Sequence, residues 1–183
     1  MALLLFSILL FLVTAIILHS DLTYFFNSKN PSLLGDASEG LGNLTDNTYV
    51  QLSGQGDHRS KFADINGKTY KYFLVLGTPI LIEQPAKGVR STGEISIVKF
   101  NGNGRIRKLS NLFKYDMLLD NFKNSIGIDL KENGYILQEG IRPVEMWVQA
   151  GLVLLTMALL VYSVIKYAAV VIAGRRTAAN HEE

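Results

Sequence analysis

Two long runs of apolar residues lie near the two ends of the chain. Ala2–Leu18 is interrupted only by Ser7 and Thr14, and Trp147–Ile165 has Gln149 as its most polar member; neither run contains a charged residue. As α-helices, these runs would cover about 25 Å and about 28 Å, close to the hydrocarbon thickness of a bilayer. The pattern predicts a transmembrane anchor over residues 1–26 and a second transmembrane helix over residues 146–174.

The first run has an alternative interpretation as the apolar core of a cleaved signal peptide, with Val13–Ala15 as a small-residue cleavage site. No Lys or Arg precedes this run, and apolar residues continue through Leu18. A signal peptide normally carries a basic region before its core and ends soon after it. The sequence therefore favours an uncleaved anchor.

Aromatic and basic side chains mark the ends of the second run. Aromatic rings are enriched at membrane interfaces, a lysine near a helix end reaches the headgroups with its long stem, and cations that flank a span favour the cytoplasmic side. We therefore expect both termini in the cytoplasm, a cytoplasmic tail at residues 175–183, and the central part outside the cytoplasm. The expected membrane-interface anchors are Trp147, Tyr162, Lys166, Tyr167, Arg175 and Arg176. Within the run, Gly151 and Ala158 share a helix face, which suits close contact with the first helix or with another copy.

Between the two runs, the pattern of apolar and polar positions changes twice. Residues 27–47 are rich in Ser, Asn, Gly and Asp and predict an extended linker. From residue 48 to residue 145, short β-type runs are bounded by Gly, Pro and Asn. Asn101–Gly104 predicts a tight hairpin turn, because Asn and Gly tolerate the positive φ of type I′ turns. The predicted strands are Tyr49–Leu52, Lys68–Leu76, Ile80–Glu83, Glu94–Phe100, Arg105–Leu109 and Tyr135–Leu137.

One segment of this central region has a helical period. Leu112, Tyr115, Leu118, Leu119 and Phe122 recur at helical spacing within Ser110–Asn124. Ser110 is the expected N-cap, and Gly127 follows the end of the helix.

Several short strands and one helix predict a small, mainly β extracytoplasmic domain, which makes the chain a membrane-anchored α+β protein. The order of elements resembles an OB-like barrel, and a mixed α+β sheet is the alternative. The likeness concerns element order alone, and a fold does not define a function.

Composition and charge exclude several functional classes for this chain. The chain carries 18 Lys and Arg against 16 Asp and Glu, a formal net charge of +2, so no nucleic-acid partner is expected. It has no cysteine, which excludes disulfides and thiolate chemistry. The three histidines are scattered, and neither a cofactor nor a metal is expected. His58 lies between Asp57 and Ser60, where a polar loop is favoured over a catalytic group.

Four basic residues cluster around the predicted hairpin. Arg105 and Arg107 share one strand face, so both are expected to be exposed. The cluster is a candidate contact for anionic headgroups or an acidic partner, and protection of an edge strand by positive charge is the alternative. The possible interaction patch consists of Lys99, Arg105, Arg107 and Lys108.

The sequence indicates a non-enzymatic membrane protein whose partners are the lipid bilayer and other membrane protein subunits. A domain between two terminal helices resembles, in topology alone, the arrangement of cytochrome-oxidase assembly factors. The expected function is that of an accessory subunit or assembly factor acting through the extracytoplasmic domain. A homo-oligomeric channel and a membrane-tethered hydrolase are the alternatives.

Overall fold

A computed structural model describes residues 1–36, 44–57, 59–65, 67–86 and 98–179 of the chain. The chain divides into two compact units, one formed by Met1–Phe25 with Glu145–Glu183 and the other by Phe26–Val144. The first unit is helical, and the second carries a β-sheet with one short α-helix. The protein is therefore of the α+β class, with long apolar helices on both sides of a mixed sheet in the sequence.

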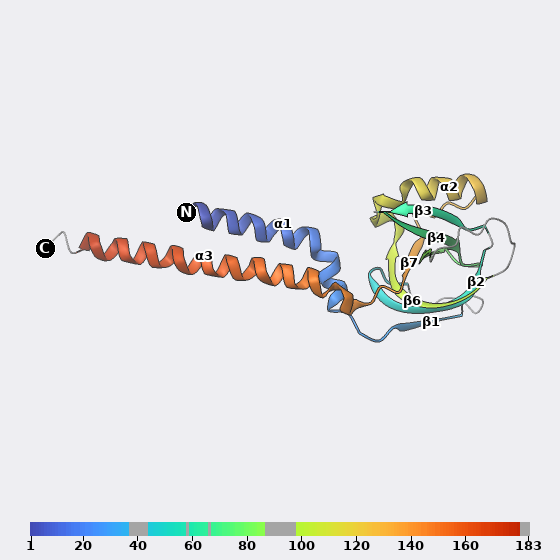
Figure 1. The fold of residues 1–183 in the computed structure, drawn as a ribbon, viewed down its shortest axis with the longest axis horizontal. Helices are drawn as coiled ribbons and strands as arrows, with labels where there is room; N and C mark the ends of the chain where they lie inside the picture. The colour runs from blue at the N-terminus through green and yellow to red at the C-terminus, as the bar shows by residue number, and fades with distance from the viewer. Residues whose placement is uncertain (37–43, 58, 66, 87–97, 180–183) are drawn as a thin grey trace. The chain divides into compact units, whose positions relative to one another are not determined.

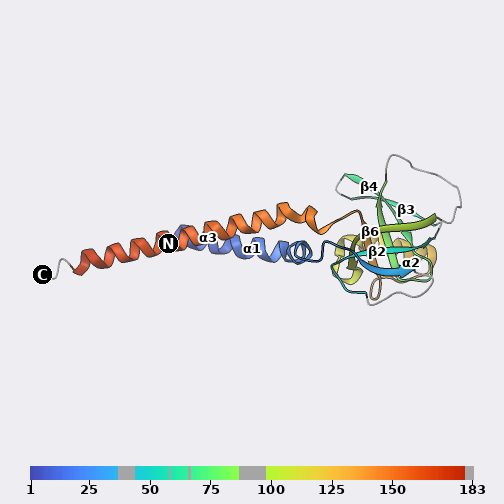
Figure 2. The same cartoon turned by 90° about the horizontal axis from the view of Figure 1, so that it is seen from below.

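The helical unit consists of α1 (Ala2–Phe25) and α3 (Trp147–Ala179), which lie side by side (Figures 1 and 2). A 3₁₀ turn, Pro143–Met146, precedes α3. The face predicted for close helix contact is not the buried one, because Ala158 is exposed and a Cβ added at Gly151 would meet nothing within 4 Å. Small or hydroxyl side chains are buried along the two helices instead: Ser7, Ala150, Thr156 and Ser163.

The buried serine and threonine hydroxyls of this unit are satisfied within their own helices. Ser7 Oγ donates to Leu3 O at 2.8 Å, and Ser163 Oγ donates to Leu159 O at 2.8 Å. Thr156 Oγ1 donates to Val153 O at 2.9 Å. Each of these hydroxyls therefore has a hydrogen-bond acceptor without water, which suits helices in an apolar surrounding. Both helices are long and apolar enough to cross a bilayer by length and composition.

The second unit is built on a seven-stranded mixed sheet with the strand order β1-β2-β6-β7-β5-β4-β3. The pairs β1/β2 and β5/β7 are parallel, and the other neighbours are antiparallel. The strands are β1 (Ser32–Asp36), β2 (Thr48–Gly56), β3 (Lys61–Ile65), β4 (Lys68–Leu74), β5 (Ile80–Pro85), β6 (Val98–Lys108) and β7 (Tyr135–Glu139).

The sheet is strongly curled (Figure 1), so strands far apart in its order share one apolar core. We call the face that carries this core the inner face; its buried residues come from β1, β2, β4, β5, β6 and β7 and include Val50, Phe73, Ile82, Ile106 and Leu137. One isolated bridge, Gly56 to Val75, links the ends of β2 and β4. The sheet is nevertheless not closed. The predicted OB-like barrel is not confirmed, and the mixed α+β sheet describes the domain.

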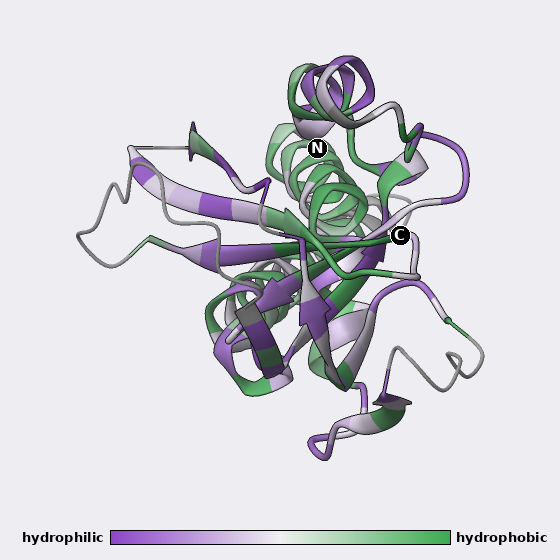
Figure 3. Ribbon diagram, turned by 90° about the vertical axis from the view of Figure 1, so that its right-hand side faces the viewer, coloured by the Kyte–Doolittle hydropathy of each residue, from purple (hydrophilic) through white to green (hydrophobic). Residues whose placement is uncertain are grey.

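The opposite, outer face of the sheet is covered by α2 (Asp116–Ile126), which appears beside β3 and β4 in Figure 1. Leu118, Leu119 and Phe122 of α2 pack with Leu81 and Ile136 of the sheet. This alternation of apolar side chains between the two faces follows from the two-residue period of a strand. Figure 3 shows the hydrophobic parts of the strands within the domain and more polar segments toward its edges.

The helix was predicted at the correct place, but its first turn was not. Two 3₁₀ turns, Leu109–Asn111 and Phe113–Tyr115, precede α2, and the N-cap is Tyr115 rather than Ser110. Gly127 ends the helix as predicted, with a φ of 79° and its N–H donating to Lys123 O at 2.8 Å. Such a left-handed C-terminal position favours glycine.

The predicted hairpin at Asn101–Gly104 is wrong. These residues lie inside β6, which pairs with β2 from Val98 to Ile106, and Gln51 faces Asn103 in that pairing. None of the four residues has a positive φ. A Cβ on Gly104 would collide with the backbone carbonyl of Gln138, so this glycine permits close approach of β6 and β7. Residues 94–97 of the predicted strand Glu94–Phe100 lie outside the described residues, and its end belongs to β6.

Two edge strands were not predicted. The segment expected to be a linker, residues 27–47, contains β1, and residues 37–43 of it lie outside the described part. Lys61–Ile65, for which no strand was predicted, forms β3 at the other edge of the sheet.

Candidate functional site

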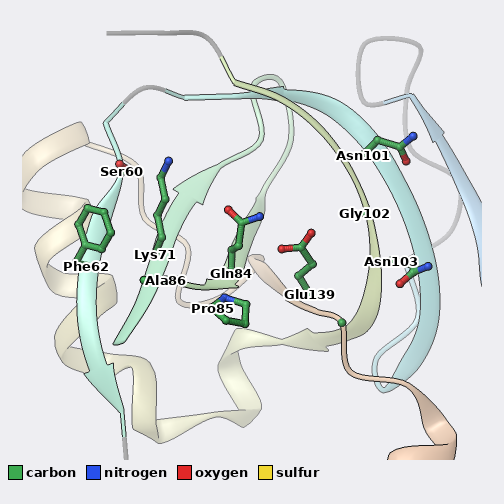
Figure 4. A pocket seen from close by; sticks show the side chains of 11 residues that line it. Ser60, Phe62, Lys71, Gln84, Pro85, Ala86, Asn101, Gly102, Asn103 and Glu139 are labelled. Atoms are coloured by element: carbon green, nitrogen blue, oxygen red, sulfur yellow. The ribbon is translucent and has the colours of Figure 1, made fainter. Parts of the chain in front are cut away.

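A polar groove of about 710 Å³ opens on the inner face of the sheet (Figure 4). We call it the inner groove. Lys71, Gln84 and Glu139 project into it from β4, β5 and β7. The register explains why they meet. Lys71 is paired with Gln84, and the parallel pairing of Glu83 with Gln138 brings Gln84 next to Glu139.

The row of side chains in the inner groove continues to the edge of the sheet. Phe62 of β3 is paired with Lys71, and Gly104 of β6 is paired with Glu139. Neighbouring strands lie about 4.8 Å apart, so this row crosses the sheet in steps of that size. Gly102 and Gly104 contribute no side chain, and the space beside them is occupied by the Phe100 ring and by the backbone carbonyl of Gln138. The groove therefore offers an ammonium, an amide and a carboxyl group beside one aromatic ring.

A second groove, of about 280 Å³, lies between β3 and α2, and we call it the α2 groove. Its β3 wall is Lys61–Asp64. The opposite wall consists of residues that recur every three or four positions and therefore share one helix face. These residues are Lys114, Met117, Leu118, Asn121 and Ser125. Phe62 lines both the inner groove and the α2 groove, so β3 separates two hollows.

Large apolar side chains are exposed beside the α2 groove. Met117 lines the groove and is 81% exposed, and Phe113, in the 3₁₀ turn before α2 and next to the groove residue Lys114, is 84% exposed. Exposed apolar groups that lie next to a groove are typical of contact surfaces, whereas isolated ones are common on any protein. The α2 groove therefore lies next to exposed apolar side chains that suit contact with another protein.

The lysines around β3 differ from the other lysines near α2. Lys123 is paired with Asp129 at 2.7 Å, and Lys131 is paired with Asp120 at 3.1 Å. By contrast, Lys61, Lys71 and Lys114 form no ion pair with any residue in the described part of the chain. Lys71 and Lys114 instead lie over the rings of Phe73 and Tyr115, at 5.6 and 4.6 Å. Three positive charges around one edge strand thus lack an acidic partner within the described residues.

The outer face carries a buried polar cluster below α2. Glu83 is only 5% exposed, and its Oε2 accepts hydrogen bonds from the hydroxyls of Tyr72 at 2.9 Å and Tyr115 at 2.6 Å. Gln138 Nε2 donates to Glu83 Oε1 at 3.1 Å and to the Tyr115 hydroxyl at 3.0 Å. Burial, followed by the nearby Glu83 carboxylate, raises the pKa of both tyrosines. Because all four side chains are buried, the cluster is part of the core.

The basic patch predicted from the sequence is not a single exposed surface. Lys99 is exposed, but Arg105 is only 4% exposed, and its Nε donates to Asn47 Oδ1 at 2.8 Å. Arg107 Nε lies 3.4 Å from Asp46 Oδ1, and Lys108 is half-buried. The expectation that both arginines are exposed is therefore wrong, because the curled sheet buries one and holds the other beside Asp46.

The predicted membrane-interface residues all lie on α3. Trp147, Tyr162, Lys166 and Tyr167 are exposed, and Lys166 Nζ lies 5.9 Å from the centre of the Tyr162 ring. Arg175 and Arg176 belong to the last turns of the helix backbone.

Other candidate chemistry does not converge. Asp57 is buried and accepts hydrogen bonds from the Arg59 side chain, with the shortest contact 2.6 Å between Arg59 Nη2 and Asp57 Oδ2. His58 lies outside the described residues. No group of three or more His, Asp or Glu side chains suited to a metal ion occurs among the described residues.

No protein-family model, curated protein or solved structure matches this chain. The two grooves beside β3 and the apolar helices are therefore the features from which a function must be inferred.

Proposed function

We propose that this protein is a two-span membrane protein and that its domain of residues 26–144 binds another membrane protein subunit outside the cytoplasm. In this proposal it is an accessory subunit or assembly factor without enzymatic activity. The lipid bilayer and the partner subunit are its binding partners.

The distribution of side chains on α1 and α3 is the observation that carries the proposal. Ser7, Thr156 and Ser163 are buried, whereas large aliphatic residues such as Ile16 are exposed, in that case by 74%. A helix pair of a soluble protein normally has the opposite arrangement, with large apolar residues inside. Small residues inside and aliphatic residues outside are typical of helices surrounded by lipid.

The sheet unit supports binding through protein contacts. Among the described residues, the groups whose pKa is raised most, Tyr72 and Tyr115, belong to the buried cluster rather than to either groove. An enzyme commonly places its perturbed groups in the cleft where the substrate binds. The exposed Phe113 and Met117 instead suit contact with another protein.

The proposal is tested with membranes from cells that produce the full chain with a C-terminal tag. We expect the chain to remain in the membrane pellet after washing with alkaline carbonate, since two spans resist such extraction. In a mild detergent it should co-purify with a defined partner in a larger complex. Release by carbonate contradicts the membrane spans. A chain that migrates alone, without a partner, contradicts the role as an accessory subunit.

A further inference from the structure

We infer that the outer edge of β3 binds an acidic, extended segment of the partner protein, which adds to the sheet as a further strand. The inference rests on the proposed function and specifies the surface and the chemistry of its protein contact. β3 is the last strand of the sheet and is paired only with β4 among the described residues. Half of the backbone N–H and C=O groups of such an edge point away from the sheet and are available to another strand.

The two grooves are placed where the side chains of an added strand would lie. Successive side chains of a strand point to opposite faces of the sheet. A strand beside β3 would therefore direct alternate side chains into the inner groove and the α2 groove, which lie on the two sides of β3 and share Phe62. In recognition by strand addition, backbone hydrogen bonds supply affinity and pockets for alternate side chains supply specificity. The five residues of β3 provide about 17 Å of edge for this pairing.

The unpaired lysines define the charge of the added strand. Lys61 and Lys114 line the α2 groove, and Lys71 lines the inner groove. Asp64 also lines the α2 groove and Glu139 the inner groove, so lysines outnumber carboxylates two to one in the α2 groove and equal them in the inner groove. The charge that selects an acidic strand therefore lies on the α2 side, where a carboxylate of the added strand would meet Lys61 and Lys114. On the α2 side, Met117 and Leu118 also favour an aliphatic group.

A second copy of this chain is a poorer occupant of the same edge. If two β3 edges paired with each other, the lysines of one copy would lie near the lysines of the other, and like charges that face each other are unfavourable. Lysine on an edge strand discourages pairing between identical or basic strands. The same lysines attract an acidic strand, so they favour an acidic partner over a basic one or a second copy of this chain.

The test uses the full chain in lipid nanodiscs and fluorescent nonapeptides that alternate Val with Glu, Thr or Lys. Fluorescence anisotropy measures binding of each peptide. We expect the Glu peptide to bind most tightly and the Lys peptide most weakly. The double variant Lys61→Glu, Lys114→Glu should weaken binding of the Glu peptide about tenfold, since attraction by the half-buried Lys61 and the exposed Lys114 becomes repulsion. Lys99→Glu, at an exposed position of β6, is the matched control and should bind as the wild type does.

Backbone chemistry separates strand addition from simple charge attraction. A Glu peptide that is N-methylated at alternate residues keeps its charge but loses the N–H groups needed for pairing, and we expect it not to bind. The inference is overturned if no peptide binds, if the N-methylated peptide binds equally well, or if the double variant binds like the Lys99→Glu control. Equal thermal unfolding midpoints of the two variants check that the sheet remains folded.

Occupation by a second copy is tested directly, because the chain has no cysteine. An Ala63→Cys variant that forms a disulfide-linked dimer in native membranes would place a second β3 at this edge and overturn the inference. A chain that stays in the membrane and co-purifies with a partner, yet binds no acidic peptide, overturns the role of the β3 edge alone. The proposed function would then stand.

Discussion

At the scale of single residues, Glu83 shows how a charged group is accommodated in the core. Three donors surround its carboxylate, namely the hydroxyls of Tyr72 and Tyr115 and the side-chain amide of Gln138. A buried acceptor that loses a donor retains its desolvation cost, so each of these contacts stabilises the folded state. The cluster joins β4, β5, β7 and the turn before α2, and its members come from distant parts of the sequence.

We predict that Tyr115→Phe lowers the free energy of unfolding by about 1–3 kcal/mol, because Glu83 and Gln138 each lose a partner. Denaturant unfolding of the full chain in detergent, followed by tyrosine and tryptophan fluorescence, measures this change. Tyr135→Phe is the control, since the Tyr135 hydroxyl reaches Leu44 O only at 3.5 Å. An equal loss of stability in both variants would contradict the importance of the cluster.

The same cluster predicts loss of stability at alkaline pH. The pKa values of Tyr72 and Tyr115 are raised in the folded protein, so the unfolded chain releases their protons first. Their contribution to stability is complete below the ordinary tyrosine pKa of about 10 and is lost as pH rises through the raised values. The double variant Tyr72→Phe, Tyr115→Phe should show a shallower decline of unfolding free energy above about pH 10. A decline as steep as that of the wild type would count against this explanation.

At the scale of elements, β6 is the strand for which the sequence and the structure differ most. The Asn-Gly pairs at Asn101–Gly104 predict a hairpin between two strands, yet β6 crosses this segment without turning. The decisive contact is between backbones, since Gly104 lies against the carbonyl of Gln138. Glycine thus serves close strand approach here rather than a positive φ.

A disulfide distinguishes the continuous strand from the hairpin. Gln51 and Asn103 face each other across β2 and β6, and directly paired residues of antiparallel strands have Cα atoms about 4.5–5.5 Å apart. This distance suits a disulfide. We predict that Gln51→Cys with Asn103→Cys oxidises readily, as seen by a change in gel mobility that a reductant reverses. The pair Gln51→Cys with Lys108→Cys should not form a bond, because Lys108 is paired with Tyr135. The opposite result would favour the hairpin.

The elements that could be predicted are those whose signal is local. Both apolar helices, the strands at β2, β4, β5 and β7 and the Gly127 cap follow from periodicity, β propensity and turn residues. The edge strands β1 and β3 are short and alternate poorly between apolar and polar residues. Each is held in the sheet by pairing with a single neighbouring strand. The grooves beside β3 were not predictable either, because parallel pairing of β5 with β7 brings Gln84 next to Glu139. Nothing in the local sequence specifies that pairing.

At the scale of the whole molecule, the two units have opposite distributions of apolar residues. The sheet unit has an aliphatic and aromatic core, including Phe73 and Leu137, whereas the helices bury Ser7 and Ser163 and expose aliphatic residues. One chain thus carries a part suited to water and a part suited to lipid. If the helices span a membrane as proposed, the charges that flank the second apolar run determine on which side the sheet unit lies.

We predict that the sheet unit lies outside the cytoplasm and that residues 175–183 lie inside. Lys166, Arg175 and Arg176 follow the second apolar run, and such cations resist transfer across the membrane, whereas long polar domains are translocated largely regardless of charge. Because the chain has no cysteine, single cysteines report their location cleanly. In intact cells, an impermeant maleimide should label Glu132→Cys, which is an exposed position, and should label Thr177→Cys only after permeabilisation.

The flanking charges also provide the control for this orientation. Replacing Lys166, Arg175 and Arg176 together by Glu should reduce the fraction of chains labelled at Glu132→Cys in intact cells, because the determinant that keeps the C-terminal end inside is removed. Replacing Lys99, Lys114 and Lys123 by Glu changes the net charge by the same amount within the sheet unit and should leave labelling unchanged. Labelling of Thr177→Cys in intact cells, together with protection of Glu132→Cys, would establish the inverted topology and place the β3 edge in the cytoplasm.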